Sequence, residues 1–233
     1  MAVLLSQLPL LDAAHRQGGI ASPLVALGSQ QFPEPPGYLR RWAGERGYAT
    51  MAAEPSMAAL FRDRYGVAEY SDVDLNDDAA IRLDLSAPLP PGLAGSAGTV
   101  LDGGTIEHIA DLLQVLENIH LLLRPGGTFI GLLPVGWWEH GFFNLNPRAF
   151  RAVAAANAWE PLAEGLWFRV RLPVLGTRFI TAITREGEVR PRAKLWTDRL
   201  LNRAIPGRTI YCCCYRKTAD VPFTPPTDVF GNW

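Results

Sequence analysis

The segment covering residues 98–147 constrains the fold of this chain more than any other part of the sequence. Thr99–Asp102 is a short apolar run that ends in an acid, and Thr128–Leu133 is a second apolar run. Between them, apolar residues recur at helical spacing over Ile106–Leu123. The residues 124–127, Arg-Pro-Gly-Gly, are expected to end this helix, because proline cannot continue it and glycine tolerates a positive φ. A strand, a helix and a strand within about 35 residues predict a right-handed crossover between parallel strands.

The composition indicates a globular protein of ordinary hydrophobicity. The chain has 233 residues, of which 48% are hydrophobic and 19% charged, so it can bury a sizeable core as one domain. The formal net charge of -1 gives no electrostatic reason to expect nucleic acid or an anionic membrane surface as a partner. No run reaches the roughly 18 consecutive apolar residues that a membrane span needs.

Three parts of the chain are distinguished. Residues 1–20 are expected to form an N-terminal docking helix or leader, because they lack the basic start and cleavage site of a signal peptide. Residues 21–218 form the main domain, and residues 219–233 form an extended tail. The three cysteines, Cys212, Cys213 and Cys214, are adjacent and alternate between the faces of a strand, so they cannot build a disulfide framework. A reduced, cytoplasmic protein is therefore expected.

Further elements before the central segment complete a predicted parallel sheet. Leu24–Leu27 is a continuous apolar run that ends at a glycine, which is typical of a buried parallel strand entering a ligand loop. Helical spacing covers residues 38–47 and 56–65. Residues 68–74 predict a second strand that ends in an acid, and residues 80–83 predict a short strand.

The last third of the chain predicts a helix and an antiparallel pair of strands. Asn146 is a suitable N-cap for a helix over residues 148–157. Residues 166–173 and 208–216 are β-type runs that would form a terminal antiparallel hairpin. The basic segment between them, residues 174–207, is open to three interpretations: a helical excursion, an oligomerisation arm or a solvated face.

The sequence of the central segment resembles one known family. The string GGTIEHIAD, followed by VLENIHLLLRPGGTFIGLLP, is similar to the second half of class I S-adenosylmethionine-dependent methyltransferases. This resemblance implies a Rossmann-like, three-layer α/β/α fold whose seven-stranded, mostly parallel sheet ends in the antiparallel hairpin. It also implies an enzyme that transfers a methyl group from S-adenosylmethionine to a small organic acceptor.

The same resemblance implies where the cofactor binds. Gly28 matches the first glycine of the family's glycine-rich loop, whereas Ser29 and Gln30 replace the others with hydrogen-bonding side chains, so this first loop is degenerate. A carboxylate at the end of the second strand accepts hydrogen bonds from the ribose hydroxyls in such folds, which assigns Asp74, with Asp72 as the alternative. The implied cofactor-binding residues are Gly28, Ser29, Asp74, Asp84, Leu85, Gly103, Gly104 and Thr105.

Candidate catalytic residues lie in two loops at the predicted carboxyl ends of the strands. Histidine is the natural base near neutral pH, and His108 and His140 are the candidates, with Glu107 as an orienting group. His108 is expected at the start of the predicted helix, where the helix dipole disfavours its charged form. No cluster with the spacing of metal ligands is evident, so no metal site is predicted. The aromatic loop that follows is expected to cover the acceptor through Trp137, Trp138, Phe142, Phe143 and Asn144.

Other functions are weighed against methyl transfer. The chain has no Walker loop, no Gly-x-Ser-x-Gly elbow and no His-Glu-x-x-His helix, so hydrolase and triphosphatase readings have no support. The Gly-x-Gly-x-x-Gly pattern of a dinucleotide-binding reductase is also absent after the first strand. A methyltransferase-like protein that has lost catalysis and serves as a binding or partner subunit is one alternative, and a fold repurposed for other chemistry is another. Homo-oligomerisation is left open.

Overall fold

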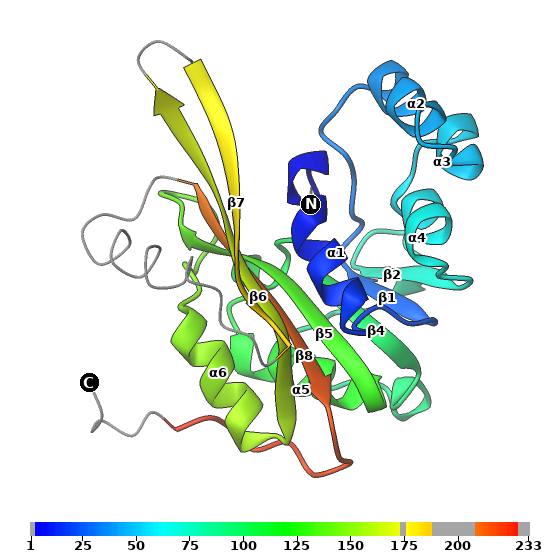
Figure 1. Cartoon of the computed structure of the whole chain (residues 1–233). Helices are drawn as coiled ribbons and strands as arrows, with labels where there is room; N and C mark the ends of the chain where they lie inside the picture. The colour runs from blue at the N-terminus through cyan, green and yellow to red at the C-terminus, as the bar shows by residue number, and fades with distance from the viewer. Residues whose placement is uncertain (1–2, 173–175, 188–207, 228–233) are drawn as a thin grey trace.

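The computed structural model describes residues 3–172, 176–187 and 208–227, and one mixed sheet dominates it (Figure 1). Its strands are β1 (Leu24–Leu27), β2 (Tyr70–Asp74), β3 (Ile81–Arg82), β4 (Ala97–Asp102), β5 (Leu123–Gly136), β6 (Trp159–Leu172), β7 (Gly176–Glu186) and β8 (Thr209–Lys217). Their order in the sheet is β3-β2-β1-β4-β5-β8-β6-β7. Strands β1 to β5 pair in parallel, and β8, β6 and β7 continue the sheet with antiparallel pairing.

This topology confirms the predicted Rossmann-like sheet with an antiparallel end and adds one strand to it. The eighth strand, β7, pairs with β6 from Gly176 to Glu186. It lies in the basic segment for which the sequence left three interpretations open. A strand was not among them, because the surrounding basic residues obscured the β-type run FITAIT over residues 179–184. Residues 188–207 lie outside the described part of the chain.

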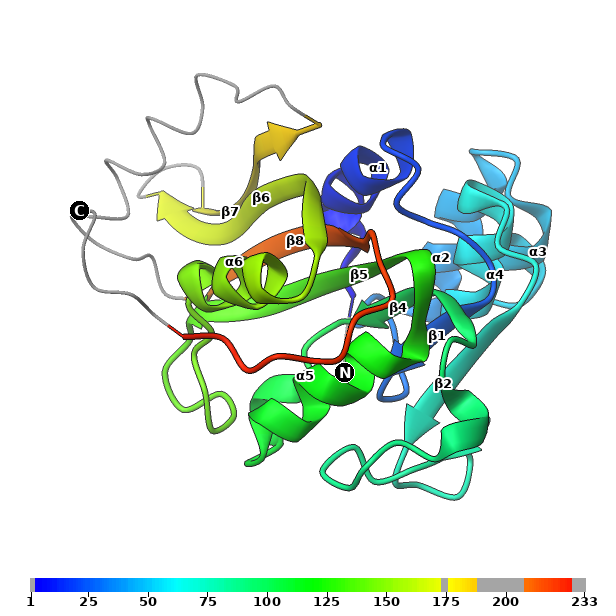
Figure 2. The same ribbon diagram turned by 90° about the horizontal axis from the view of Figure 1, so that it is seen from below.

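Helices on both faces of the sheet make three layers (Figure 2). On one face lie α5 (Leu112–Leu122) and α6 (Pro147–Ala156), and on the other lie α1 (Leu8–Arg16), α2 (Pro36–Gly44), α3 (Ala49–Ala53) and α4 (Met57–Tyr65). Three short 3-10 turns are η1 (Leu5–Gln7), η2 (Pro91–Leu93) and η3 (Ile106–His108). None of the helices in the described part of the chain is long and apolar enough to cross a membrane.

Two hydrophobic clusters, one on each face, hold the layers together. Along β1, Leu24 and Ala26 belong to one cluster, whereas Val25 and Leu27 belong to the other. The cysteines of β8 alternate in the same way, since Cys213 packs on the face opposite Cys212 and Cys214. All three cysteines are free and buried. The expected alternation of their side chains is confirmed.

The helix of the central segment begins six residues later than predicted. Asp111 caps α5, and its Oδ1 accepts a hydrogen bond from the Gln114 amide at 3.0 Å. Residues 106–108 form the separate turn η3, so His108 does not lie at the start of α5. The helical spacing continued through this turn because Ile106 is buried in the same core as the helix. The expected effect of the helix dipole on His108 is therefore wrong.

The two ends of the described chain pack against the domain. The expected N-terminal docking helix is α1, whose Leu10 and Leu11 are buried in the core. Asp12 of this helix forms an ion pair with Arg64 of α4 at 2.6 Å. At the other end, residues 218–227 have no regular secondary structure, and Asn157 of α6 holds them by hydrogen bonds with the backbone of Thr224.

Candidate functional site

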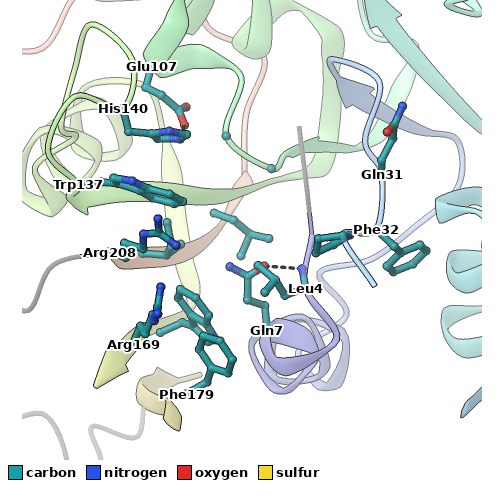
Figure 3. Close-up of a pocket in the computed structure, with 16 residues that line it drawn as sticks. Leu4, Gln7, Gln31, Phe32, Glu107, Trp137, His140, Arg169, Phe179 and Arg208 are labelled. Carbon is teal, nitrogen blue, oxygen red and sulfur yellow. Dashed lines mark hydrogen bonds and ion pairs between the residues drawn. The ribbon is translucent and has the colours of Figure 1, made fainter. Parts of the chain in front are cut away.

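A cavity of about 560 Å³ opens at the carboxyl ends of the central parallel strands (Figure 3). Ligands bind at this edge in open α/β sheets, because the loops after neighbouring strands converge there. The loops after β1, β4 and β5 contribute Gln31 and Phe32, Gly103 and Gly104, and Trp137 and His140. The antiparallel strands close the far side with Trp167, Arg169, Phe179, Arg208 and Ile210.

Glu107 is a buried carboxyl group at the inner end of this cavity. It is 0% exposed, and neither of its carboxyl oxygens has a hydrogen-bond partner among the described residues. Burial raises the pKa of Glu107, and the nearby carboxyl group of Asp102 raises it further. Asp102, the last residue of β4, is also 0% exposed, and burial raises its pKa despite the hydrogen bond from the Thr105 amide. Two buried carboxyl groups at one strand end are typical of a functional site.

The two candidate histidines meet beside Glu107. The Nε2 atom of His140 lies 3.4 Å from Glu107 Oε1. The rings of His108 and His140 are 5.1 Å apart and nearly perpendicular, at 81°. Burial lowers the pKa of both histidines, and for His140 the positive charge of Arg208 contributes as well. The structure therefore brings together all three residues that the sequence proposed for catalysis.

The loop after β5 places His140 through a close backbone contact. Gly141, with a φ of +75°, packs against Glu107 so tightly that an added Cβ would come within 2.8 Å of the Glu107 carbonyl oxygen. The amides of Phe142 and Phe143 donate to the same carbonyl oxygen at 2.7 and 3.3 Å. Trp137 then stacks on His140 with a ring separation of 4.0 Å.

Only one of the five loop residues predicted to cover the acceptor lines the cavity. Trp137 lines it, whereas Trp138 is 87% exposed and Phe142 is 69% exposed. Phe143 packs against the core on the α5 side of the sheet. The side chain of Asn144 accepts a hydrogen bond from the Trp137 amide at 2.7 Å, so it stabilises the loop between these two residues. The expectation that Trp138 and Phe142 cover the acceptor is corrected, because both side chains are exposed and neither lines the cavity.

The loops after β1 and β2 are linked through Ser29. Its amide donates to Asp74 Oδ2 at 2.9 Å, and its hydroxyl donates to Asp72 Oδ2 at 2.6 Å. Hydrogen bonds from the backbone of Ser29, Leu75 and Asn76 lower the pKa of Asp74. An ionised carboxylate accepts about four hydrogen bonds, so Asp74 keeps capacity for one further donor. Gly28 precedes this link with a φ of +72°.

The side chain of Gln30 fills the space that a second loop glycine would leave open. Gln30 is 8% exposed, and its Nε2 donates to the Leu27 carbonyl oxygen at 2.6 Å. A Cβ added at Gly103 would collide with Gln30 Oε1. Thr105 holds the same Leu27 carbonyl oxygen with its hydroxyl at 2.5 Å. The Oε1 of Gln30 and the Oδ2 of Asp102 are both buried without a hydrogen-bond partner in the described chain.

These two acceptors fit one group of the implied cofactor. Buried polar atoms are almost always paired in native proteins. The unpaired oxygens Gln30 Oε1 and Asp102 Oδ2 are therefore unusual, and a donor from a bound ligand would pair them. The α-ammonium of S-adenosylmethionine supplies three donors in a compact cation. The ends of β1, β2 and β4 thus carry acceptors of the kind that the cofactor would use, but Gln30, Asp102 and Asp74 are not among the residues that line the cavity in this structure.

Of the residues proposed to bind the cofactor, Gly103 and Gly104 line the cavity, whereas Gly28, Ser29, Asp74, Asp84, Leu85 and Thr105 do not. Asp84 is an exposed turn cap, since its Oδ1 accepts hydrogen bonds from both the amide and the hydroxyl of Ser86. Leu85 is buried, and its carbonyl oxygen accepts from Asn118 at 2.9 Å. The local role of Asp84 is the turn-forming role that aspartate often has in loops.

Two arginines of the cavity wall were not predicted from the sequence. Arg208 lies with its guanidinium 5.0 Å from the ring centre of Trp137, and its non-glycine backbone has a φ of +64°. Arg169, near the end of β6, lines the same wall. Among the ion pairs of the described residues, neither arginine has a carboxylate partner. The available signal was a basic residue beside each predicted β-run, but strand pairing alone decides that both reach the cavity.

The structure also brings together a candidate metal-ligand set that the sequence did not reveal. Glu107, His108 and His140 each offer one ligand atom, and these atoms lie within 4.8 Å of one another. Their spacing in the sequence is uninformative, because the loop after β5 carries His140 back onto η3. The expectation that no metal-ligand cluster exists is therefore corrected.

No protein-family model matches this chain, and no curated protein matches it. Solved structures of S-adenosylmethionine-dependent methyltransferases align with it. The alignment with one from Archaeoglobus fulgidus covers 91% of this chain and 94% of the Archaeoglobus chain, with 12% identity and a TM-score of 0.45. Another, from Thermotoga maritima, covers 91% and 88%, with 13% identity and a TM-score of 0.44. A third, from Mesorhizobium loti, covers 91% and 97%, with 14% identity and a TM-score of 0.35.

The fold assignment itself follows from the sheet. Its parallel order β3-β2-β1-β4-β5, extended by the antiparallel strands β8 and β6, is that of the class I methyltransferase fold that the sequence predicts. Fold alone does not establish an activity.

Proposed function

We propose that this protein transfers a methyl group from S-adenosylmethionine to a small organic acceptor that carries an anionic group. The observation that carries the proposal is the cavity at the ends of β1, β4 and β5. It joins the glycines of the cofactor side, Gly103 and Gly104, to an aromatic and basic wall. A mostly apolar cavity with a few convergent polar groups is the usual form of a small-molecule site.

The cofactor would be held by three strand ends. Asp74 would accept from the ribose, and the unpartnered oxygens of Gln30 and Asp102 would accept from the α-ammonium. When bound, S-adenosylmethionine supplies a methyl group that its positive sulfur already activates. Orientation and exclusion of water therefore remain as the main tasks of the protein chain.

The acceptor would lie against the antiparallel end of the sheet. Trp137, Trp167 and Phe179 offer apolar surface, and the rings of the last two stack at 5.1 Å. Arg169 and Arg208 offer two guanidinium groups, which favour a carboxylate or phosphate because they donate in a planar fork. A nucleophile bound at the end of the cavity that Glu107 and His140 line would lie beside these two groups, which can hold its proton.

The first test of this function is the affinity for S-adenosylhomocysteine, measured by isothermal titration calorimetry. The wild-type protein is expected to bind at micromolar strength. Asp74→Ala is expected to weaken binding at least about tenfold, because a charge-assisted hydrogen bond contributes about 1.5–3 kcal/mol. Asp78→Ala removes the same charge from an exposed position in the same loop and serves as the matched control. Absence of binding by the folded wild-type protein at millimolar ligand would refute the proposal.

A second test concerns the anionic group of the acceptor. In a screen that measures S-adenosylhomocysteine production, aromatic acids and phosphates are expected to be methylated in preference to their neutral esters. Arg208→Ala is expected to raise KM for the preferred acid about tenfold or more, with a smaller change in kcat. Arg208→Lys keeps the charge and should recover part of the loss. Equal turnover of acids and esters by the wild-type protein would contradict this acceptor class.

One observation favours a second candidate function, that of a catalytically inactive binding or partner subunit. The Gln30 side chain occupies space beside Gly103 that a glycine would leave free. The calorimetric test separates the two functions, because the inactive subunit need not bind S-adenosylhomocysteine. If wild-type protein fails to bind it and Gln30→Gly does bind it, the side chain is what blocks the pocket.

A further inference from the structure

We propose that Glu107, His108 and His140 bind one divalent transition-metal ion at the inner end of the cavity. This site goes beyond methyl transfer and does not depend on it, because the three side chains are brought together by the fold alone. Two imidazoles and one carboxylate form a ligand set that suits zinc, manganese, iron or cobalt. Magnesium prefers oxygen ligands and is a poor match.

The positions of the ligand atoms support a single ion. All three lie within 4.8 Å of one another, and His140 Nε2 is 3.4 Å from Glu107 Oε1. Ligands at about 2.1 Å from one ion are about 3–4 Å apart. A movement of the exposed His108 ring by about 1 Å toward the other two ligands would therefore complete the set.

The state of Glu107 is the second, independent observation. Its side chain is 0% exposed and lines the cavity, yet neither oxygen has a hydrogen-bond partner in the described part of the chain. His140 Nε2, at 3.4 Å, compensates a charge on Glu107 only when its ring is protonated, and a buried carboxyl group without a hydrogen bond is unfavourable by several kcal/mol. A bound cation would supply the missing partner, and the buried carboxyl group of Asp102 would add negative charge nearby.

Backbone hydrogen bonds and a ring stack hold Glu107 and His140 in this arrangement. The Glu107 carbonyl oxygen accepts two amide hydrogen bonds from the loop that carries His140, and Trp137 stacks on the His140 ring at 4.0 Å. Glu107 is thus held through its backbone and His140 through its ring, as neighbouring groups usually orient metal ligands. Three protein ligands leave coordination positions open, and because Glu107 and His140 line the cavity, these positions would be reached from it.

The experiment is a titration of metal-free, full-length protein with Co²⁺, followed by visible absorption and by competition with Zn²⁺. One ion per chain is expected, with a dissociation constant in the micromolar range and displacement by Zn²⁺ but not by Mg²⁺. His140→Ala and Glu107→Gln are expected to weaken binding at least about tenfold. His108→Ala removes an exposed ligand and should weaken binding without loss of fold, which circular dichroism checks. His15→Ala, an exposed histidine outside the trio, is the control.

The outcomes separate this site from the proposed function. No Co²⁺ or Zn²⁺ binding by wild-type protein below about 1 mM, a weak affinity on the ordinary scale, would overturn the site. Unchanged affinity in both His108→Ala and His140→Ala would overturn it as well, and would leave Glu107 and His140 as a metal-free pair. Metal binding without S-adenosylhomocysteine binding would retain the site and remove methyl transfer.

Discussion

Glu164→Ala is expected to lower the free energy of unfolding by about 2–5 kcal/mol, because Arg151 and one of two buried tyrosine hydroxyls lose their acceptor at about 1–3 kcal/mol each. The two hydroxyls keep only the hydrogen bond between them, at 3.1 Å. The hydroxyls of Tyr211 and Tyr215 donate to Glu164 Oε1 at 2.6 and 3.0 Å, and Arg151 forms a two-pronged ion pair with the same carboxylate. These residues join β6, β8 and α6. Urea denaturation monitored by circular dichroism measures the loss.

Two further variants test whether the lost hydrogen bonds cause the loss of stability. Glu164→Gln keeps one acceptor oxygen and should lose less, about 1–2 kcal/mol. Glu160→Ala breaks an exposed ion pair with Arg216 and should change stability by less than about 1 kcal/mol. If Glu164→Ala were as stable as Glu160→Ala, the buried network would make no net contribution, and the joint between α6 and the sheet would rest on apolar contacts.

The same carboxylate gives stability a pH dependence of known sign. Burial alone would raise the pKa of Glu164, but the hydrogen bonds from Arg151, Tyr211 and Tyr215 and the charge of Arg151 outweigh it, so the pKa lies below its ordinary value of 4.5. A depressed pKa contributes stability that is fully present above the unfolded value and is lost as the pH falls through the folded value. The stability of the wild-type protein should therefore fall more steeply below pH 4.5 than that of Glu164→Gln.

The central half of the fold could be predicted because local patterns and tertiary pairing agree there. Leu24–Leu27 is a strand with the predicted bounds, and α6 begins at Pro147, one residue before the predicted start, with Asn146 as its cap. Strand β7 could not be placed because it depends on a partner strand, and the start of α5 was misplaced although its cap, Asp111, is a local signal. The helical spacing around η3 came from a buried turn, and β7 is stabilised by pairing with β6.

For the site, the sequence predicted which loops converge but not which side chains enter the cavity. His140 and Glu107 were named from loop position, and the fold brings them within 3.4 Å. Arg169 and Arg208 were missed, because their placement depends on the register of β6 and β8. Asp84, in contrast, was assigned to the site by resemblance, but its carboxylate caps a local turn.

Gly141→Ala is expected to have the largest effect on the candidate site. With a φ of +75°, alanine at this position is strained by about 1–2 kcal/mol. Its Cβ would also come within 2.8 Å of the Glu107 carbonyl oxygen and 2.9 Å of Glu107 Cγ. The exposed loop should therefore move away and carry His140 with it. We expect at least about a tenfold loss of methyl transfer, on the scale of a lost positioning contact. Faster amide exchange over residues 137–143, followed by mass spectrometry, would report the movement directly.

Gly126→Ala is the matched control for this change. Gly126 has a φ of +83°, but a Cβ added there would meet nothing within 4 Å. Both variants share the strain of the left-handed backbone, so the difference between them isolates the contact with Glu107. Gly141→Ala should be less stable than Gly126→Ala by about 1–3 kcal/mol, the usual effect of overpacking. Equal stability together with unchanged amide exchange in the loop would show that the chain tolerates the Cβ, and that the pairing of His140 with Glu107 is held by the Trp137 stack instead.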